Sequence, residues 1–411
     1  MKRLSVDITP LRESAGFRRI WIGSTATAFG SQLGAFAAAL QVWDQTNNAA
    51  LLGLIGVIKA APLIIFAVVG GTASDRISRR AVALISAVGQ TASTAILAVV
   101  LLLKSDAIVT LFILVLLQSA FTAYGAPARR SFVAMLLPSQ QIGAGLALTN
   151  ISFQLSMLVG PALAGVIAAV WSPPICFVLE ALGLSVAFYG LLRLPAEASK
   201  PGSRKQNAIV DTLDGFRYLF KRPVLAVAML SDLNATVFAM PVALFPVINA
   251  ERFGGDPTTL GLFAPALAVG GLVASAAARL YSSAARPGVV MMASGVTWAA
   301  ALLSFGLSPA LPLALFFLAV AGFADTVAVV TRGTLIQLAV DEQYRGRVSG
   351  ADYIVGVGGP EIGNARAGLT ASITSGSTSI VLGAAASIVG ALLLSALGKQ
   401  ARSYQAQEDS N

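Results

Sequence analysis

The chain has 411 residues, of which 56% are hydrophobic and only 11% are charged, and its mean hydropathy is +0.78. A soluble protein would carry about 25% charged residues, so most of this chain faces lipid or other apolar helices. Histidine is absent, which excludes a Ser-His-Asp triad and removes the commonest metal ligand. The single cysteine, Cys176, excludes an internal disulfide and a cysteine-based metal cluster. No Gly-x4-Gly-Lys-Ser/Thr phosphate loop occurs, so we expect no enzyme, no cofactor or metal and no direct use of ATP.

Twelve segments are long enough to cross a bilayer, which takes about 20 mostly apolar residues. In chain order we predict helices at 20–42, 50–70, 81–103, 108–127, 143–168, 172–194, 223–248, 258–280, 288–307, 312–331, 348–371 and 378–397. The first run is too long for the core of a cleavable signal peptide, so we expect none. The pattern predicts an all-α membrane protein with twelve transmembrane helices.

The positions of the basic residues predict the orientation. When both termini are placed in the cytoplasm, all but four of the 28 lysines and arginines fall on the cytoplasmic side. The exceptions are Lys59, Lys104, Arg252 and Arg366. Topology therefore explains the formal charge of +9, and we expect a lipid bilayer rather than a nucleic acid as partner.

Residues 195–222 separate two halves of similar length. Within them, 208–221 carries apolar residues in a pattern typical of an amphipathic helix on the cytoplasmic membrane surface. We predict a six-helix bundle over 1–194, a cytoplasmic linker with this helix over 195–222, a second six-helix bundle over 223–398 and a polar tail over 399–411.

The two halves resemble a diverged repeat. At an offset of 202 residues, Arg130 matches Arg332 and Gln141 matches Gln343. Each match is weak alone, but repeated bundles are an architecture known from transporters.

A charged segment, GGTASDRISRR at residues 70–80, lies between two apolar runs and predicts a cytoplasmic loop. A helix N-terminus carries a partial positive charge, so Asp75 is suited to hold the start of the eleventh predicted helix and an arginine after the fourth. The predicted cytoplasmic gate consists of Gly71, Asp75, Arg76, Arg79, Arg80, Arg129 and Arg130. The alternative is that Arg79 and Arg80 only follow the positive-inside rule.

With twelve spans, a repeat of six and this loop, the sequence resembles the major facilitator superfamily. The family signature in the loop is Gly, Asp four residues later, Arg and then a basic pair, and Ser78 here replaces a usual glycine. The stretch from Arg332 to Val348 is similar to the branch that contains the bacterial enterobactin exporters.

A second motif resembles the Gly-Pro motif of the superfamily's exporters. It consists of Gly160, Pro161 and Gly165, with Ala164 in place of one glycine. The motif predicts a helix kink, and it favours export over import. The alternative is an ordinary packing kink.

The resemblance implies a secondary active exporter of small molecules in a bacterial cytoplasmic (inner) membrane. It implies two bundles that rock about a central cavity, in a protein that works as a monomer. We expect coupling to protons and, as cargo, a siderophore of the enterobactin kind. The alternative is a hydrophobic drug or antibiotic.

Charged residues inside membrane spans are costly and usually functional. The predicted spans contain Lys59, Glu180, Asp232, Asp325, Glu361 and Arg366. Without histidine a carboxylate must carry any proton, and Asp232 is favoured among Asp232, Asp325 and Glu361 because it lies near the middle of its span. Lys59 and Arg366 are the candidates for binding an anionic cargo.

Glu361 follows Gly358-Gly359-Pro360, which predicts a helix interruption of the kind that lines a transport site. The alternative for each charge is a structural ion pair, such as Glu361 with Arg366.

We expect Asp75→Asn to impair transport while expression and membrane insertion stay nearly unchanged, because the substitution removes a charge from a predicted loop rather than from a lipid-facing surface. Transport assays on variant and parent at matched protein levels check this. An unchanged transport rate would show that Asp75 forms no gate.

Overall fold

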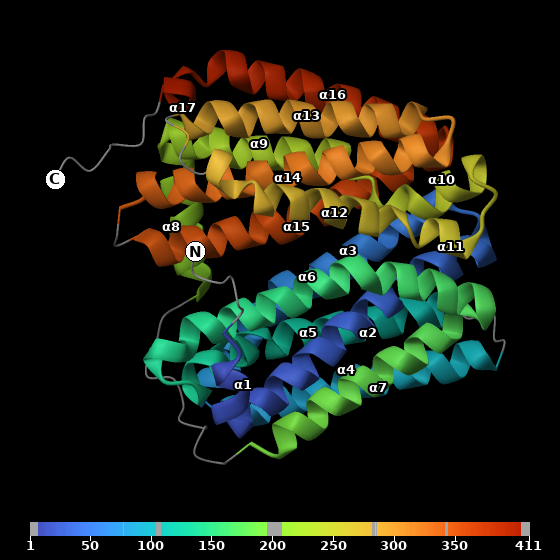
Figure 1. Ribbon diagram of the computed structural model, residues 1–411, viewed down its shortest axis with the longest axis vertical. Helices are drawn as coiled ribbons and strands as arrows, with labels where there is room; N and C mark the ends of the chain where they lie inside the picture. The colour runs from blue at the N-terminus through green and yellow to red at the C-terminus, as the bar shows by residue number, and fades with distance from the viewer. Residues whose placement is uncertain are drawn as a thin grey trace. The chain divides into compact units, whose positions relative to one another are not determined.

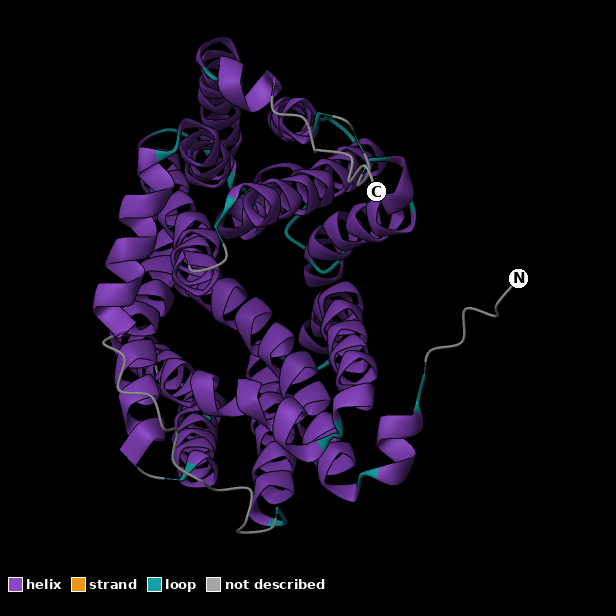
Figure 2. Ribbon diagram, turned by 90° about the vertical axis from the view of Figure 1, so that its left-hand side faces the viewer, coloured by secondary structure: helices purple, strands orange, loops and turns teal. Residues whose placement is uncertain are grey.

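The computed structural model describes residues 7–76, 78–103, 108–194, 208–281, 284, 286–341 and 344–403. Every regular element in these ranges is a helix (Figure 2), so the all-α fold class is confirmed for the described residues. The chain divides into two compact units, Met1–Gln45 with Ile58–Gln206 and Thr46–Val57 with Asn207–Asn411. The predicted domain boundaries near residues 194 and 222 stay predictions.

The part of the chain before the linker forms a series of helices (Figure 1). They are α1 (Thr9–Glu13), α2 (Ala15–Thr46), α3 (Ala49–Arg76), α4 (Arg79–Leu102), α5 (Ile108–Leu136), α6 (Ser139–Val170) and α7 (Pro173–Leu192). In the first unit α4 packs against α5 and α7. Val82, Phe132 and Leu191 belong to the buried apolar cluster at these contacts.

The rest of the chain is built in the same way. Its helices are α8 (Ala208–Lys221), α9 (Pro223–Ala239), η2 (Val242–Leu244), α10 (Phe245–Arg252), α11 (Pro257–Leu260), α12 (Phe263–Ala276), η3 (Ala278–Leu280), α13 (Pro287–Leu307), α14 (Leu311–Ala339), α15 (Arg345–Ile373), α16 (Gly376–Leu397) and α17 (Lys399–Ser403). In the second unit α13 packs against α14 and α16, and α9 packs against α15 and α16.

Nine helical segments of the described residues are long and apolar enough to cross a membrane. The other three predicted positions are occupied by α2, α3 and α15, which are 32, 28 and 29 residues long. Helices suit a bilayer because they satisfy every backbone polar group internally. The number of twelve spans and the cytoplasmic placement of both termini stay predictions.

Several helices continue past the ends predicted from their apolar runs. The segment 70–80, predicted as a loop, is helical through Arg76, and α4 begins at Arg79. Likewise α5 runs to Leu136 instead of ending at 127. The physical reason is that charged side chains end a hydrophobic run without interrupting backbone hydrogen bonds.

Ser78 has a local role in the short turn between α3 and α4. It is the N-cap of α4, and its Oγ accepts a hydrogen bond from the backbone N of Ala81 at 3.1 Å. A serine at this position satisfies one of the free N–H groups of the helix start. Ser78, which replaces the usual glycine of the motif, therefore stabilises the following helix.

Both prolines of the predicted kink and interruption lie inside continuous helices. Pro161 lies inside α6, and Pro360 lies inside α15, so the interruption predicted before Glu361 is wrong. Membrane helices tolerate proline because neighbouring groups satisfy the freed carbonyls. A break does occur where an unbroken span was predicted over 223–248: α9 ends at Ala239, and η2 and α10 follow.

The predicted amphipathic helix exists as α8. Leu219 is fully buried in a cluster with residues of α9, α14 and α15. The Tyr218 and Tyr344 rings stack with their centroids 4.3 Å apart, and Arg222 forms an ion pair with Asp341 at 2.7 Å. Part of the apolar side of α8 is thus covered by protein, and its contact with a membrane surface stays a prediction.

Close helix packing in the second unit depends on glycine. Helices α12 and α14 lie side by side (Figure 1). A Cβ atom on Gly322 would overlap the carbonyl group of Leu267, and one on Gly270 would overlap the carbonyl group of Ala319. Small residues of this kind let two backbones approach closely within a membrane.

We expect Gly322→Ala to lower the free energy of unfolding by about 1–3 kcal/mol, because the added methyl group forces α12 and α14 apart. Unfolding by sodium dodecyl sulfate in mixed micelles measures this. Gly333→Ala on the same helix is the matched control, because nothing lies within 4 Å of its Cβ position. Equal effects of the two substitutions would contradict the role of the close contact.

Candidate functional site

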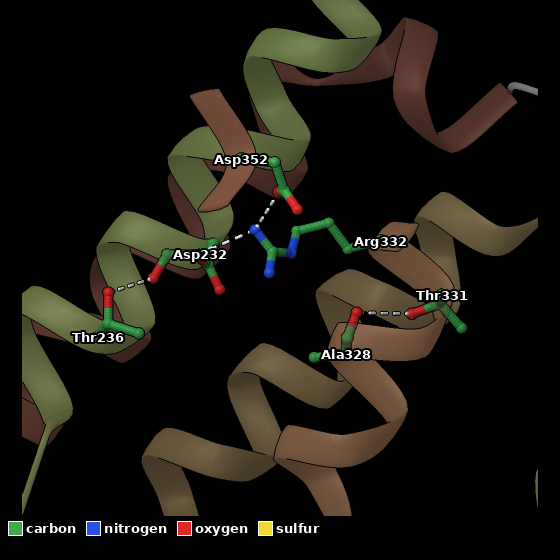
Figure 3. A network of polar contacts seen from close by, with 6 residues as sticks. All are labelled: Asp232, Thr236, Ala328, Thr331, Arg332 and Asp352. Carbon is green, nitrogen blue, oxygen red and sulfur yellow. Dashed lines mark hydrogen bonds and ion pairs between the residues drawn. The ribbon is translucent and has the colours of Figure 1, made fainter. Parts of the chain in front are cut away.

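Arg332 lies between two carboxylates in the second unit (Figure 3). Its Nη1 is 3.0 Å from Oδ2 of Asp232 on α9 and 2.8 Å from Oδ1 of Asp352 on α15. The Arg332 and Asp232 side chains are only 10% and 13% exposed, and that of Asp352 is 34% exposed. One cation on α14 therefore links α14 to both α9 and α15.

The hydroxyl groups of Thr331 and Thr236 do not bind the charged side chains of this group. Thr331 donates to the Val327 carbonyl at 2.7 Å, and Thr236 donates to the backbone carbonyl of Asp232 at 2.8 Å. Asp232 Oδ2 accepts no hydrogen bond among the described residues, yet it lies at ion-pair distance from Arg332. Their attraction is Coulombic and does not need hydrogen-bond geometry.

A cavity of about 210 Å³ borders this group of charges. Residues of α9, α13, α14 and α15 form its wall together with Met240, which directly follows α9, and Met291 and Trp298 add further apolar side chains. Its charged lining residues are Asp232, Asp325 and Arg332.

Asp325 adds a second carboxylate to the cavity wall. It is an exposed residue of α14 that interacts electrostatically with both Asp232 and Arg332. With Asp352 nearby, three carboxylates surround a single guanidinium. This cavity therefore attracts protons and cations more than anions.

The sequence-based prediction missed Arg332 and Asp352 as members of the site. Arg332 was assigned to a loop because the tenth span was ended at residue 331, whereas α14 continues to Ala339. Asp352 lies inside the predicted span 348–371, and that position was the signal that it belonged among the costly membrane charges. The structure does bring Asp232 and Asp325, both predicted, to one cavity.

Arg366, predicted as a cargo-binding residue, is engaged with backbone. Its Nε donates to the Val237 carbonyl at 3.0 Å, and its Nη2 donates to the Phe238 carbonyl at 2.7 Å. These carbonyls belong to the last turn of α9, whose final C=O groups have no partner within the helix. Arg366 thus supplies hydrogen-bond donors to the free carbonyl groups at the C-terminal end of α9.

Glu361 lies on the same helix as Arg366. Its Oε2 accepts a hydrogen bond from Asn364 Nδ2 at 3.1 Å, and Asn364 Oδ1 accepts one from the backbone N of Ala243 at 3.1 Å. Both residues therefore lie beside the break that follows α9. The ion pair between Glu361 and Arg366 stays a prediction.

The predicted cytoplasmic gate is described only in part. Gly71, Asp75 and Arg76 lie in α3, and their side chains are outside the described residues. Arg80 Nη2 donates to the Leu192 carbonyl at 2.7 Å, and Arg129 Nη1 donates to Ser86 Oγ at 2.9 Å.

The remaining gate residues are Arg79 and Arg130. Arg79 Nη1 lies 3.4 Å from the sulfur of Met135, and Arg130 lies on α5. The proposed interaction of these arginines with Asp75 stays a prediction.

The Gly-Pro motif lies at a close contact in the first unit. A Cβ atom on Gly160 would lie 3.0 Å from Cγ of Gln32 on α2 and still nearer to its Cβ. Gly165 and Pro161 are buried on the same helix. Close packing of α6 on α2 explains the glycine, whereas a functional kink stays a prediction.

We expect Arg332→Met to lower the free energy of unfolding by about 3–5 kcal/mol, because it leaves buried carboxylates without a cation. Arg222→Met is the control: its ion pair with Asp341 has side chains 47% and 48% exposed, and such pairs contribute about 0–1 kcal/mol. Unfolding titrations in mixed micelles compare the two. Losses of equal size would show that burial of the Arg332 group is unimportant.

Comparison with known proteins places this arrangement in a family. A family model described as "Transmembrane secretion effector" matches residues 5–411. The enterobactin exporter EntS of Citrobacter koseri is 26% identical over 404 residues, which cover 97% of this chain and 96% of that protein. EntS of Salmonella typhimurium is 25% identical over 402 residues, which cover 97% and 96%.

Solved structures agree on the fold. The nucleoside transporter NupG superposes with a TM-score of 0.73 at 15% identity, covering 94% of this chain and 99% of that one. A bacterial homologue of the iron transporter ferroportin, in an inward-facing state, gives a TM-score of 0.70 at 16% identity, covering 95% and 99%. The chain belongs to the transmembrane secretion effector family of major facilitator transporters.

Proposed function

We propose that this protein is a proton-coupled exporter of small molecules in the inner membrane of a bacterium. The observation that carries the proposal is the single Arg332 guanidinium held by Asp232 and Asp352 beside a cavity that also exposes Asp325. Relatives named as exporters support the direction of transport. The proposal includes alternating access of two six-helix bundles in a monomer, with the cytoplasmic gate around Asp75.

The geometry suggests how a proton is coupled to movement. When Asp232 binds a proton, its attraction for Arg332 falls, and the guanidinium is then held by Asp352 alone. The link between α14 and α9 weakens while the link between α14 and α15 persists. A proton thereby changes which pair of helices is fastened together, which is the kind of differential interaction that shifts a conformational equilibrium.

The first candidate cargo is a siderophore of the enterobactin kind, because the similar EntS proteins are named as enterobactin exporters. Lys59 and Arg366 stay candidates for binding its anionic groups, although the Arg366 guanidinium already donates to two carbonyls. Loss of siderophore secretion in Lys59→Ala would support that role.

The second candidate cargo is a hydrophobic drug, and a specific observation favours it. Apolar Met240, Met291 and Trp298 line the cavity together with two carboxylates and one arginine. Apolar walls with a surplus of acidic groups suit an amphipathic molecule that is neutral or positively charged.

We expect efflux from proteoliposomes to require an imposed pH gradient and to be lost in Asp232→Asn, Asp325→Asn or Glu361→Gln, with Asp232→Asn the most severe. The measurement uses radiolabelled enterobactin and, in parallel, a hydrophobic cationic dye. Asp341→Asn, in the exposed pair with Arg222, is the control that should retain efflux.

The outcomes separate the parts of the proposal. Gradient-driven efflux that persists in all three variants would refute coupling through these carboxylates. Efflux of the dye without enterobactin would select the drug as cargo. No efflux of either compound by the parent protein would contradict both cargo assignments.

A further inference from the structure

Glu180 is the most deeply buried carboxylate in the described part of the chain, with only 4% of the residue exposed. It lies in α7, one of the helices long and apolar enough to cross a membrane. It belongs to the first unit, whereas Asp232 and Asp325 belong to the second. A buried acid at this depth needs a physical explanation, and the coupling scheme above does not use it.

Two glycines of α2 make the space that Glu180 occupies. A Cβ atom on Gly34 would overlap the Glu180 carboxylate, and one on Gly30 would lie 3.0 Å from the Glu180 Cα. The backbone of α2 therefore covers one side of the carboxylate closely.

The polar partners of Glu180 are neutral. Gln118 Nε2 on α5 donates to Glu180 Oε1 at 2.7 Å and also to Thr94 Oγ1 on α4 at 2.9 Å. No lysine or arginine forms an ion pair with Glu180 among the described residues. One hydrogen bond from a neutral amide group is thus the direct stabilisation of the ionised form.

Two titratable groups face Glu180. Lys59 on α3 attracts it electrostatically from beyond ion-pair contact. Cys176, one helical turn earlier on α7, also acts on it through space, and its sulfur lies 3.8 Å from the Ala164 carbonyl on α6. The contacts from α2 and α5 are made by glycine and glutamine, which do not titrate near neutrality.

Two opposing effects act on the ionised form of Glu180. Burial within a membrane helix disfavours the carboxylate, whereas the hydrogen bond from Gln118 favours it. Opposition of this kind is what a group needs in order to take up and release a proton.

We propose that Glu180 is a proton-binding site of the first unit. Its carboxylic acid releases a proton to give the carboxylate, which Gln118 and Lys59 stabilise, and burial against α2 favours the reverse step. Only its use in transport rests on the proposed function; the proton binding itself does not.

Infrared difference spectroscopy of the purified full-length protein tests this site. As the pH is raised, we expect the carbonyl stretching band of a buried carboxylic acid to disappear in the parent protein, and we expect that band to be absent from the spectra of Glu180→Gln. The bands of Asp232 and Asp325 are common to both proteins and cancel when the variant's spectra are subtracted from the parent's. The glutamine oxygen still accepts from Gln118, so the variant keeps the packing of α7. Glu13→Gln, on the exposed surface of the same unit, is the control that retains the band. A parent-minus-variant spectrum without a buried-acid band would overturn the proposal.

A second variant covers the case in which Glu180→Gln does not fold. Gln118→Met removes the donor to the carboxylate, so the acid band should persist to higher pH than in the parent protein. An unchanged band would overturn the proposal. If the parent shows no gradient-driven efflux but Glu180→Gln lacks the band, the proposed function fails while the proton-binding site stands.

Discussion

A guanidinium group buried inside a membrane protein must be neutralised where it lies, and the second unit is organised around that constraint. Arg332 cannot be deprotonated, so the carboxylates of Asp232 and Asp352 are needed beside it. Because each acid is on a different helix, neutralising one charge also determines which faces of α9, α14 and α15 meet. This placement also determines the cavity wall, in which Asp325 and Arg332 lie two helical turns apart on α14.

The apolar packing that surrounds these charges is made possible by residues without side chains. Lipid offers no hydrophobic driving force between helices, so close backbone contact is what holds them together. Gly322 and Gly270 allow this between α12 and α14, and Gly34 allows it between α2 and α7. In the first case the contact brings backbone to backbone, whereas in the second it encloses an ionisable group. The same device therefore joins two backbones in one unit and makes room for a buried carboxylate in the other.

Hydropathy was sufficient to predict helical segments at every position where the structure has a long helix, because bilayer thickness sets their length. It placed the ends poorly, because a charge such as that of Arg129 ends an apolar run without ending the helix, and α5 continues to Leu136. The position of the helix break was also predicted wrongly. Pro360 is accommodated within α15, whereas α9 ends before Pro241.

The site was predicted in part for a related reason. Asp232 and Asp325 were recognised because a carboxylate in an apolar run is costly, and that cost is visible in the sequence. Arg332 was missed because it directly follows the apolar run that ends at residue 331. Asp352 lies inside the predicted span 348–371, but the sequence does not show which residue neutralises its charge. Their pairing across 20 residues and two helices is a tertiary fact.

The engagement of Arg366 with the end of α9 has a consequence for biosynthesis. The Val237 and Phe238 carbonyls obtain their donor from a residue more than one hundred positions later in the chain. Until that residue has been synthesised and inserted, the break after α9 presents unsatisfied carbonyl groups to the bilayer, which are costly in hydrocarbon. A nascent chain that stops before α15 therefore lacks the guanidinium group that donates to these two carbonyls.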